Sequence, residues 1–266
     1  MIPITLTIAG SDSGGGAGIQ ADLKTFSALE TYGASVLTAL TAQNTLGVTA
    51  IHDVPTDFIS AQLDTVFSDL DVKAVKIGML SQPAIIETVA AGLRKHKVKK
   101  IVLDPVMVAE SGDPLLAADA VSSLVEHLFP LATLITPNLH EAARLLNEDM
   151  ATTNEAMEQQ AVALQVMGAN SVLVKGGHSP GRDAVDVLVN AGKAQWFSTP
   201  FIETKNTHGT GCSLSSAITA RLAHGDELPV AVETSKRWLT GAIKQADQLA
   251  VGSSAGPVHH FHSLWK

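Results

Sequence analysis

The sequence predicts an α/β fold, in which helices cover both faces of a mostly parallel central sheet. Short apolar runs alternate with longer amphipathic stretches along the 266 residues, as repeated strand–helix–strand units require. Several runs, ITLTIAG and SVLVKGG among them, are almost continuously apolar, which is typical of parallel strands buried on both faces. Hydrophobic residues form 45% of the chain and charged residues 17%, which is enough apolar material for a large core.

The individual elements follow from where these two patterns fall. Apolar runs bounded by turn residues predict strands at residues 4–9, 35–42, 74–77, 100–103, 133–135, 171–174, 185–189 and 195–198. Amphipathic stretches predict helices near residues 18–29, 57–68, 83–95, 117–127, 139–146, 154–167, 211–223 and 228–249. The last two strands are separated by Asn190-Ala191-Gly192-Lys193, a turn sequence that predicts a hairpin at the edge of the sheet.

Composition limits the domain organisation and the classes of partner. No long Pro/Ser-rich linker, charge block or internal repeat divides the chain, so we predict one domain for residues 1–266. The 26 acidic and 18 basic residues give a formal net charge of −8, which disfavours binding to nucleic acid or anionic membranes. No run reaches the roughly 18 apolar residues of a membrane span, and no basic residue precedes the first apolar stretch as in a secretory signal. We therefore expect a cytoplasmic protein. Its one cysteine excludes an internal disulfide and a cysteine-based zinc site.

Polar and small residues follow five of the predicted strands. They read GSD at 10–12, GM at 78–79, DP at 104–105, TPN at 136–138 and KGG at 175–177. Because ligands of open parallel sheets bind outside the carboxyl ends of the strands, these residues predict one common crevice. Turn and cap chemistry explains such residues at one strand end, and explains five converging ends less well.

The glycine-rich loop at residues 13–18 tests the chain for a dinucleotide site. Gly16, Gly18 and Ala21 satisfy the pattern G-x-G-x-x-A between a strand and a helix. That type of site also needs an acidic residue after the second strand to hold the ribose. The second strand here ends in TAQN at 41–44, so a dehydrogenase is disfavoured. The mononucleotide motif G-x-x-x-x-G-K-[ST] is also missing.

A second glycine cluster, GTG at residues 209–211, directly precedes a long run of helix formers. Backbone N–H groups at such a helix start can bind an anion, because the helix dipole favours negative charge there. Glycine also allows the backbone to approach the anion closely. An ordinary glycine-containing helix start is the alternative interpretation of an isolated GTG.

The combination of motifs resembles the ribokinase superfamily, and within it the bacterial hydroxymethylpyrimidine/phosphomethylpyrimidine kinases. The matching motifs span the chain in order: IAGSDSGGGAGIQADLKTF (8–26), TALTAQNT (38–45), KIGML (76–80), VLDPVM (102–107), TPNLHEA (136–142), VLVKGGH (172–178), NTHGTGCSLSSAI (206–218) and GPVHHFH (256–262). The resemblance implies a three-layer α/β/α sandwich, ATP as the phosphoryl donor, Mg²⁺ and a homodimer. It implies two transfers in thiamine biosynthesis, first to the hydroxymethyl group of 4-amino-5-hydroxymethyl-2-methylpyrimidine and then to the resulting monophosphate.

Two other functions remain to be weighed. A pyridoxine or pyridoxal kinase of the same fold is the nearest alternative, because its acceptor is also a flat heteroaromatic ring bearing a hydroxymethyl group. Gln43 and the whole set of motifs favour the pyrimidine. A non-catalytic binding protein on this scaffold would have lost part of the catalytic set, whereas every motif residue is present here.

The resemblance assigns the catalytic residues one by one. Gly209, Thr210 and Gly211 match the family's anion hole, and Lys175 is placed to meet the phosphates of ATP. Cys212 occupies the position where most of the superfamily has an aspartate base. Because a helix N-terminus favours a thiolate, we expect a lowered pKa for Cys212 and a role as general base. A small buried apolar residue is the alternative role for this cysteine.

Two carboxylates are expected on the magnesium side of the site. They are Asp104, which ends the strand IVL, and Glu141, which lies in N-x-x-E at a helix start. Magnesium keeps most of its waters, so one or two carboxylates suffice. A turn before Pro105 and a carboxylate at the helix dipole are the purely structural alternatives.

Four residues are expected to bind the acceptor. Gln43 offers a donor and an acceptor to an aminopyrimidine edge. Asp22 accepts from the amino or hydroxymethyl group, or else is a solvated carboxylate of the first helical turn. Met79 and Val106 are expected to form apolar walls against the ring, although a methionine after a core strand often serves packing alone.

The histidines and the loops complete the expectations. His259, His260 and His262 could chelate a metal, but zinc sites prefer helical or turn spacings with a fixed second shell, and no carboxylate is near in the sequence. We therefore expect these histidines to pack the C-terminus. His208 is expected to orient the GTG loop. Residues 14–18 and 111–113 are candidate lids over the substrate, and the adenine pocket is expected in the C-terminal third of the chain.

Overall fold

The computed structural model describes residues 1–108, 115–116, 119–177 and 183–265. In these residues nine strands form one sheet in the order β3-β2-β1-β4-β5-β6-β7-β8-β9. The strands from β2 to β7 pair in parallel, whereas β3, β8 and β9 are antiparallel to their neighbours. Their bounds are β1 Ile4–Asp12, β2 Tyr32–Asn44, β3 Gly47–Asp53, β4 Val72–Ile77, β5 Ile101–Leu103, β6 Leu134–Ile135, β7 Ser171–Lys175, β8 Ala184–Asn190 and β9 Lys193–Thr199.

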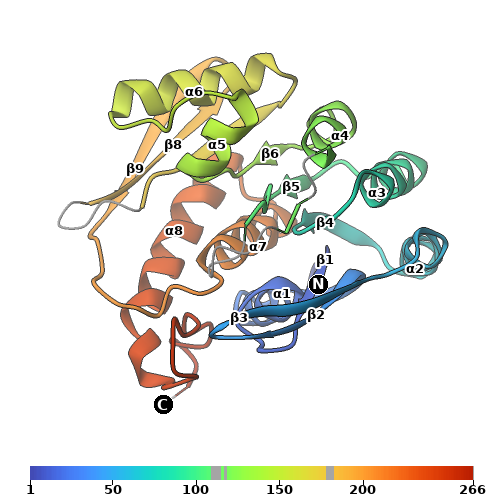
Figure 1. Cartoon of the computed structure of the whole chain (residues 1–266), viewed down its shortest axis with the longest axis horizontal. Coiled ribbons are helices and arrows are strands. Elements are labelled where there is room, and N and C mark those ends of the chain that lie inside the picture. The colour runs from blue at the N-terminus through green and yellow to red at the C-terminus, as the bar shows by residue number, and fades with distance from the viewer. Residues whose placement is uncertain (109–114, 117–118, 178–182, 266) are drawn as a thin grey trace.

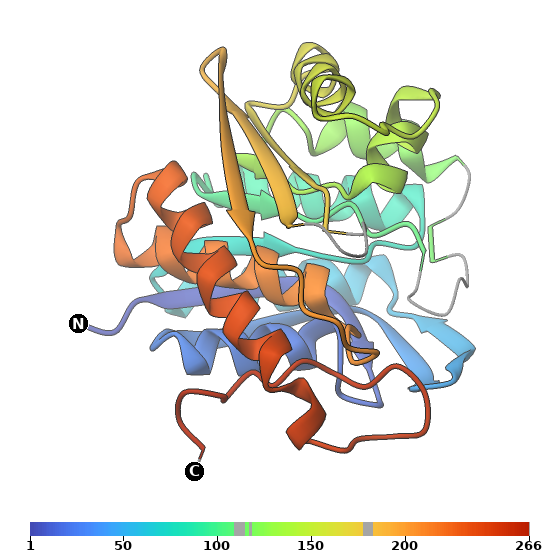
Figure 2. The ribbon, with the colours of Figure 1, turned by 90° about the vertical axis from the view of Figure 1, so that its left-hand side faces the viewer.

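Helices cover both faces of this sheet, which confirms the predicted three-layer α/β/α arrangement (Figures 1 and 2). The helices are α1 Gly18–Ala28, α2 Thr56–Asp69, α3 Pro83–Lys95, α4 Ala120–His127, α5 Leu139–Leu146, α6 Asn154–Val166, α7 Thr210–His224 and α8 Leu228–Lys244. Alternate strand residues point to opposite faces. Val75 and Leu103 pack in the core shared with α2 to α6, whereas Ala74 and Val102 pack in the core shared with α7 and α8.

One strand that the sequence pattern did not predict is β3, which pairs antiparallel with β2 at the sheet edge. Most of its residues are exposed, so it lacks the alternation of buried and exposed apolar residues on which a prediction depends. β1 and β2 also run beyond their predicted ends, to Asp12 and Asn44. This correction matters for the site, because the added residues lie at the carboxyl ends of the two strands.

Other boundaries follow local chemistry. The predicted hairpin at the far edge is confirmed: Ala191 and Gly192 have φ of 49° and 72°, the left-handed pair of a two-residue hairpin loop. The helix predicted at 228–249 ends earlier, at Lys244, and a short 3₁₀ helix at Ala246–Gln248 follows it. No helix in the described ranges is long and apolar enough to cross a bilayer.

The order of the strands places the site. The chain runs from β1 to β2 on one side and then crosses to β4 on the other side of β1. In open α/β sheets, the crevice at such a reversal, outside the carboxyl ends of the strands, is where ligands bind. Here that crevice is bounded by the ends of β1, β2 and β4.

Candidate active site

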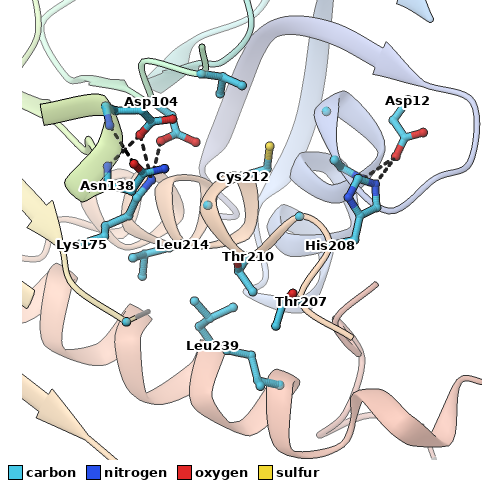
Figure 3. A pocket seen from close by; sticks show the side chains of 18 of the residues that line it. Asp12, Asp104, Asn138, Lys175, Thr207, His208, Thr210, Cys212, Leu214 and Leu239 are labelled. Carbon is cyan, nitrogen blue, oxygen red and sulfur yellow. Dashed lines mark hydrogen bonds and ion pairs between the residues drawn. The ribbon is translucent and has the colours of Figure 1, made fainter. Parts of the chain in front are cut away.

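A cavity of about 430 Å³ lies at the carboxyl ends of the parallel strands. It is lined by ten of the residues that the sequence singled out: Gln43, Met79, Asp104, Val106, Glu141, Lys175, Gly209, Thr210, Gly211 and Cys212. Figure 3 shows Cys212 at the start of α7, between a cluster around Asp104 and Lys175 and a pair formed by Asp12 and His208. The expected crevice is therefore present and gathers residues from both halves of the chain.

Lys175 joins two carboxylates on one side of the cavity. Its Nζ lies 2.8 Å from Oδ1 of Asp104 and 4.0 Å from Oε2 of Glu141. Thr136 Oγ1 donates to the same Asp104 oxygen at 2.9 Å. The arrangement follows from the sheet, because Asp104 directly follows β5, Lys175 ends β7 and Glu141 lies in the first turn of the helix after β6.

Glu141 also closes the N-terminus of α5. The Asn138 side chain accepts from the Glu141 backbone N–H at 2.9 Å, and Glu141 Oε2 accepts from the Asn138 N–H at 2.7 Å. This is a capping box, so the structural alternative for Glu141 is present in the fold. Glu141 is nevertheless among the residues that line the cavity, so the same side chain caps α5 and faces the site.

The electrostatics of this cluster are uneven. Burial opposes the charged form of Asp104, but Lys175 and Lys76 outweigh it and lower the pKa of Asp104. Burial raises the pKa of Glu141 to about 7 even though Lys175 lies nearby. Burial acts against the charge of Lys175 as well, and Asp104 and Glu141 raise the pKa of its ammonium in spite of it. One ammonium thus neutralises Asp104 and leaves Glu141 short of positive charge.

That shortage bears on the expected magnesium. In the described residues no group of three or more His, Cys, Asp or Glu side chains is arranged to hold a metal ion. Asp104 and Glu141 are two carboxylates, one of them buried without a full counter-charge, and Mg²⁺ in kinases takes one or two carboxylates together with phosphates and water. The residues present therefore fit this ion.

The start of α7 forms the second side of the cavity. Gly209 has φ of +80°, and a Cβ built there would lie 2.0 Å from the carbonyl oxygen of Gly16. Only glycine fits this close approach of two backbones. A Cβ on Gly211 would lie 3.3 Å from Lys175 Nζ and 3.5 Å from Asp104 Oδ2. The first N–H groups of a helix lack intrahelical partners, and here the Thr210 N–H donates to the Thr207 carbonyl oxygen at 3.2 Å. The start of α7 thus lies beside the lysine and carboxylate cluster.

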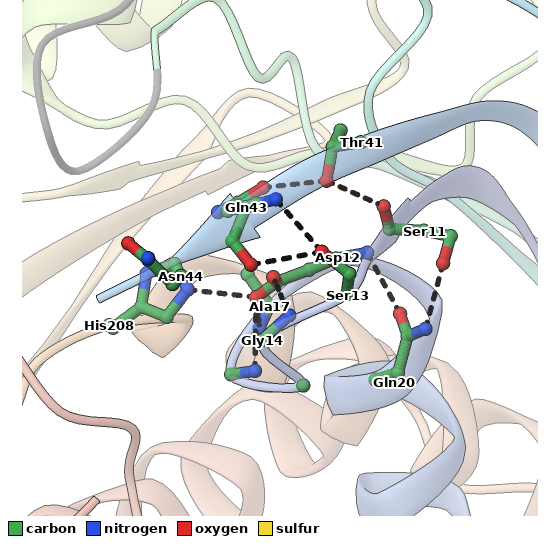
Figure 4. A network of polar contacts seen from close by, with 12 residues as sticks. Ser11, Asp12, Ser13, Gly14, Ala17, Gln20, Thr41, Gln43, Asn44 and His208 are labelled. Carbon is green, nitrogen blue, oxygen red and sulfur yellow. Dashed lines mark hydrogen bonds and ion pairs between the residues drawn. The ribbon is translucent and has the colours of Figure 1, made fainter. Parts of the chain in front are cut away.

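Asp12, at the end of β1, orders the loop at residues 13–18 (Figure 4). Its carboxylate accepts from the backbone N–H groups of Gly14 at 2.8 Å, Gly16 at 3.0 Å and Ala17 at 2.8 Å. His208 Nε2 lies 2.9 Å from the same carboxylate. Burial opposes ionisation of the Asp12 carboxyl group, but these hydrogen bonds lower the pKa of Asp12.

Asp12 therefore joins the two glycine loops. His208 directly precedes the GTG loop, as the sequence predicts for a residue that orients this loop. The sequence does not predict that Asp12 is its partner. Gly16 serves this packing, because a Cβ there would lie 2.2 Å from the His208 ring, whereas Gly18 allows a close approach to β1, where a Cβ would lie 2.4 Å from the carbonyl oxygen of Gly10. The sequence shows both glycine loops, but it does not show that they contact each other.

The expectation of a low thiol pKa is wrong. Burial raises the pKa of Cys212 to about 11, and Asp22 and Asp104 add to the increase. Lys76 and the backbone N–H of Gly18 act in the opposite direction and do not compensate. A position in the first turn of a helix is thus insufficient when the thiol is desolvated beside two carboxylates.

Asp22 does not have the predicted place in the acceptor pocket. It is fully buried, does not line the cavity, and is not a solvated carboxylate either. Its oxygens accept from Thr7 Oγ1 at 2.6 Å, Lys76 Nζ at 2.9 Å and Ser216 Oγ at 2.7 Å. Helix α1 turns Asp22 towards α7 and the sheet, where it holds a buried lysine.

Lys76 is a charged cavity residue to which the sequence reasoning assigned no role. It lies on β4, is fully buried and is among the residues that line the cavity, and a Cβ on Gly78 would lie 2.5 Å from its Nζ. Burial opposes its charge, yet Asp22, Cys212 and Asp104 raise the pKa of Lys76. A lysine in the middle of an apolar strand is a visible signal, because burying an ammonium requires a partner.

The residues expected to bind the acceptor lie at the ends of β2 and β4 and directly after β5. Gln43 Oε1 accepts from Thr41 Oγ1 at 3.0 Å, which fixes the orientation of the amide (Figure 4). Met79 is buried and Val106 is half-buried, and both line the cavity as predicted. A polar edge and two apolar walls thus lie in one place.

The other end of the cavity is largely apolar. It is built by the segment after β9, by α7 and by α8, and its apolar lining residues are Pro200, Phe201, Ile202, Leu214, Leu239 and Ile243. This lies in the C-terminal third, where an adenine pocket was expected. No motif marked these side chains, because they come from three segments and are ordinary apolar residues in each.

Of the two candidate lids, residues 111–113 lie outside the described residues. The loop at 13–18 is held by the Asp12 hydrogen bonds described above and lies against the GTG loop. His259 and His260 are buried, and His262 is half-buried, at the end of the chain.

Chains with this sheet and with phosphate-binding groups at its carboxyl edge form the ribokinase-like class of phosphotransferases, and this chain is one of them. It matches the phosphomethylpyrimidine kinase family over residues 12–259 and belongs to that family. It is 56% identical over 266 residues to a hydroxymethylpyrimidine/phosphomethylpyrimidine kinase of Rhizobium meliloti, with all of both chains covered. An ADP complex of Bacillus subtilis pyridoxal kinase matches the whole of both chains with a TM-score of 0.92 and 38% identity. A phosphomethylpyrimidine kinase of Clostridium difficile matches with a TM-score of 0.80 and 46% identity, over 91% of this chain and 100% of that one.

Proposed function

We propose that this enzyme phosphorylates 4-amino-5-hydroxymethyl-2-methylpyrimidine with ATP, and then phosphorylates the monophosphate to the diphosphate, in thiamine biosynthesis. The observation that carries the proposal is the single cavity. It holds a polar edge and apolar walls for a small ring at one end, an apolar end for a nucleotide base at the other, and phosphate-binding groups between them. Family membership supports the same activity.

The phosphate-binding groups perform most of the chemistry. Phosphoryl transfer depends on in-line positioning and on stabilising charge on the transferring group. Lys175 supplies a fixed ammonium, and the helix start at Gly209, Thr210 and Gly211 supplies N–H donors that are already oriented. The short distance between Gly211 and Lys175 puts both within reach of one phosphoryl group. In other enzymes the loss of one such donor costs about 3 kcal/mol of transition-state stabilisation.

Asp104 and Glu141 are proposed to hold Mg²⁺. When bound, this ion would neutralise charge on the phosphates of ATP and orient them. Hydrogen bonds within the chain orient both carboxylates: Thr136 and Lys175 bond to Asp104, and the Asn138 backbone N–H donates to Glu141. The raised pKa of Glu141 is consistent with a buried carboxylate that a bound cation would stabilise in its charged form.

Cys212 is proposed to receive the proton of the acceptor hydroxyl group. The oxygen of the hydroxymethyl group forms a bond to the γ-phosphorus as the bond to ADP breaks, and its proton passes to sulfur. The thiol must ionise to accept this proton, and a pKa of about 11 makes the thiolate a minor form near pH 7. Lys76 and the Gly18 N–H stabilise that form. Thiolate that does form is a strong base.

Gln43, Met79 and Val106 are proposed to select the ring. A pyridoxal kinase is the second candidate, because a structure of that activity matches the whole chain with a TM-score of 0.92. The two acceptors separate the candidates, since both present a hydroxymethyl group to the same base. We expect a higher kcat/KM for the pyrimidine; faster phosphorylation of pyridoxal would reverse the assignment.

We also propose a homodimer that works in the cytoplasm, where ATP is available. Leu40 and Ala42 are exposed on one face of β2, and Ala50 lies opposite Ala42 on β3. These side chains form a small apolar surface at the sheet edge that a second copy can cover. Light scattering should give the mass of a dimer, and Leu40→Glu should halve it. A wild-type mass of one chain would contradict the dimer.

Product analysis tests the main proposal directly. The purified protein is incubated with ATP, Mg²⁺ and the hydroxymethylpyrimidine, and products are separated by charge. We expect monophosphate first and diphosphate later. Monophosphate that never proceeds to diphosphate would refute the second step, and no pyrimidine product at all would refute the function.

A further inference from the structure

The C-terminal motif GPVHHFH, at residues 256–262, has no part in the function proposed above, yet it contacts the anion-hole segment on both sides. One contact is to His208, directly before Gly209, and the other is to Ser213, directly after Cys212. No residue of the motif lines the cavity in the part of the chain that the structure describes. Any effect of the motif on phosphoryl transfer must therefore be indirect, and these two contacts are the ones that lie next to the anion hole in the chain.

The contact before the anion hole is made by the backbone. The His208 N–H donates to the carbonyl oxygen of Gly256 at 3.0 Å, and His208 and Pro257 form an isolated parallel bridge. The Gly256 N–H in turn donates to the Asn206 side chain at 2.9 Å. With its side chain on Asp12, His208 is held from two directions, by the motif and by the loop at 13–18.

The contact after the anion hole is made by side chains. Ser213 Oγ lies 2.9 Å from His260 Nε2, and both residues are buried. Burial, with smaller effects from the nearby Lys24, His259 and His262, lowers the pKa of His260 to about 3. The imidazole is therefore neutral near pH 7, and it hydrogen-bonds to a hydroxyl group in the first turn of α7 without adding a charge.

The motif is itself firmly anchored. Val258 is fully buried in the core with α7 and α8, and the His259 N–H donates to the carbonyl oxygen of Ala242 on α8 at 3.0 Å. The rings of His260 and His262 lie 6.5 Å and 5.9 Å from the ring of Trp238, on the same helix. A segment fixed to the core at several points can transmit that rigidity to the loop it touches.

We propose that the C-terminal motif positions the anion hole, and that His260, acting through Ser213, is a positioning residue for phosphoryl transfer. The proposal rests on the proposed role of residues 209–211. N–H donors stabilise the transferring group only when they are aimed at it, and a misplacement of about 1 Å can lower the rate about a hundredfold. Holding the segment at both ends limits its displacement.

The test compares four variants with a rescue variant. His260→Ala and Ser213→Ala each remove one partner of the hydrogen bond, and the double variant removes both. His262→Ala is the matched control, because it removes a histidine of the same motif that contacts Trp238 but has no bond to Ser213. His260→Gln keeps a polar group where Nε2 lies and tests rescue. Each is measured for kcat, for KM of ATP and acceptor, for thermal stability, and for binding of ADP with and without aluminium fluoride.

We expect a kcat about ten- to a hundredfold lower for His260→Ala and Ser213→Ala, with little change in either KM. ADP affinity should persist, whereas the added affinity from aluminium fluoride, which mimics the transferring group, should fall. The double variant should lose no more than the larger single loss, and His260→Gln should recover much of the rate. His262→Ala should lower stability alone.

Three outcomes would overturn the proposal, and the first two separate it from the function on which it rests. If Gly211→Ala abolishes turnover while Ser213→Ala and His260→Ala keep wild-type kcat, the anion hole stands and the positioning role fails. If Gly211→Ala leaves kcat unchanged, the anion-hole assignment fails and the positioning role fails with it. A loss in His260→Ala that parallels its thermal stability and equals that of His262→Ala also refutes a positioning role.

Discussion

Glu141 offers a prediction in which the signs of function and stability are opposite. The change is Glu141→Gln, which keeps the shape of the side chain and an oxygen for the Asn138 N–H but removes the charge. A carboxylate that served only to cap α5 would stabilise the protein, and its loss would cost about 0.3–1 kcal/mol. A carboxylate that binds a cation is buried without enough positive charge around it when the cation is absent. Removing the negative charge of that carboxylate should therefore stabilise the free protein.

The magnitude follows from the pKa. Burial raises the pKa of Glu141 from 4.5 to about 7, so the folded protein holds this proton more tightly than the unfolded chain does. Stability from this group is therefore full below about pH 4.5 and is lost as the pH rises through about 7. At about 1.4 kcal/mol per pH unit, the loss above pH 7 amounts to about 3 kcal/mol. The glutamine side chain of the variant is neutral throughout and avoids that loss.

Urea unfolding at pH 5 and pH 8, with EDTA and without nucleotide, measures this difference. We expect Glu141→Gln to be more stable than wild type by about 3 kcal/mol at pH 8 and by less than about 1 kcal/mol at pH 5. Kinase activity should fall at both. A variant that is less stable than wild type at pH 8, or a difference that is the same at both pH values, would refute the reasoning and leave Glu141 as a cap alone.

Three further predictions concern other groups of the site. Cys212→Ser should lower kcat by orders of magnitude, and the wild-type kcat should rise from pH 7 to 9 because the thiol has a pKa of about 11; steady-state rates check both, and an undiminished rate in the variant would exclude the base. Asp22→Asn leaves the Lys76 ammonium buried without its carboxylate and should cost about 3–5 kcal/mol in urea unfolding, whereas a raised acceptor KM with unchanged stability would restore the substrate-contact role. His208→Ala removes a group that lowers the pKa of Asp12; stability from Asp12 is present above pH 3.8 and lost below it, so acid unfolding followed by circular dichroism should begin at a higher pH in the variant, and an unchanged onset would exclude the link.

Much of the fold could be predicted because its central strands are buried on both faces and leave a plain signal. β4, β5 and β7 read as apolar runs, and the turn at Ala191 and Gly192 has the residues that a two-residue hairpin requires. β3 could not be predicted in this way, since its side chains are mostly exposed and its pairing with β2 depends on backbone hydrogen bonds. A pattern of hydrophobicity detects burial, and a strand without burial escapes it.

The site divides along a similar line. Asp104, Glu141 and Lys175 were predictable, because they lie directly after β5, in the first turn of the helix after β6 and at the last residue of β7, and parallel strands bring these ends together. Asp12 and Lys76 were not assigned roles, since those roles depend on partners from distant segments, His208 for one and Asp22 for the other. Sequence position shows which element carries a residue, but the hydrogen bonds that define its role are made across the fold.

The thiol of Cys212 shows how such contacts can reverse a local expectation. The helix dipole acts within the first turn and is equivalent to roughly half a charge, whereas burial removes the thiolate from water and places it near Asp22 and Asp104. Of the charged groups that act on it, Lys76 favours ionisation, but Asp22 already partners that ammonium. The free enzyme therefore keeps a neutral thiol and avoids a third negative charge beside two carboxylates. The thiol must therefore lose its proton before Cys212 can act as the base, and the small thiolate fraction near pH 7 is the form that takes the proton of the acceptor hydroxyl group.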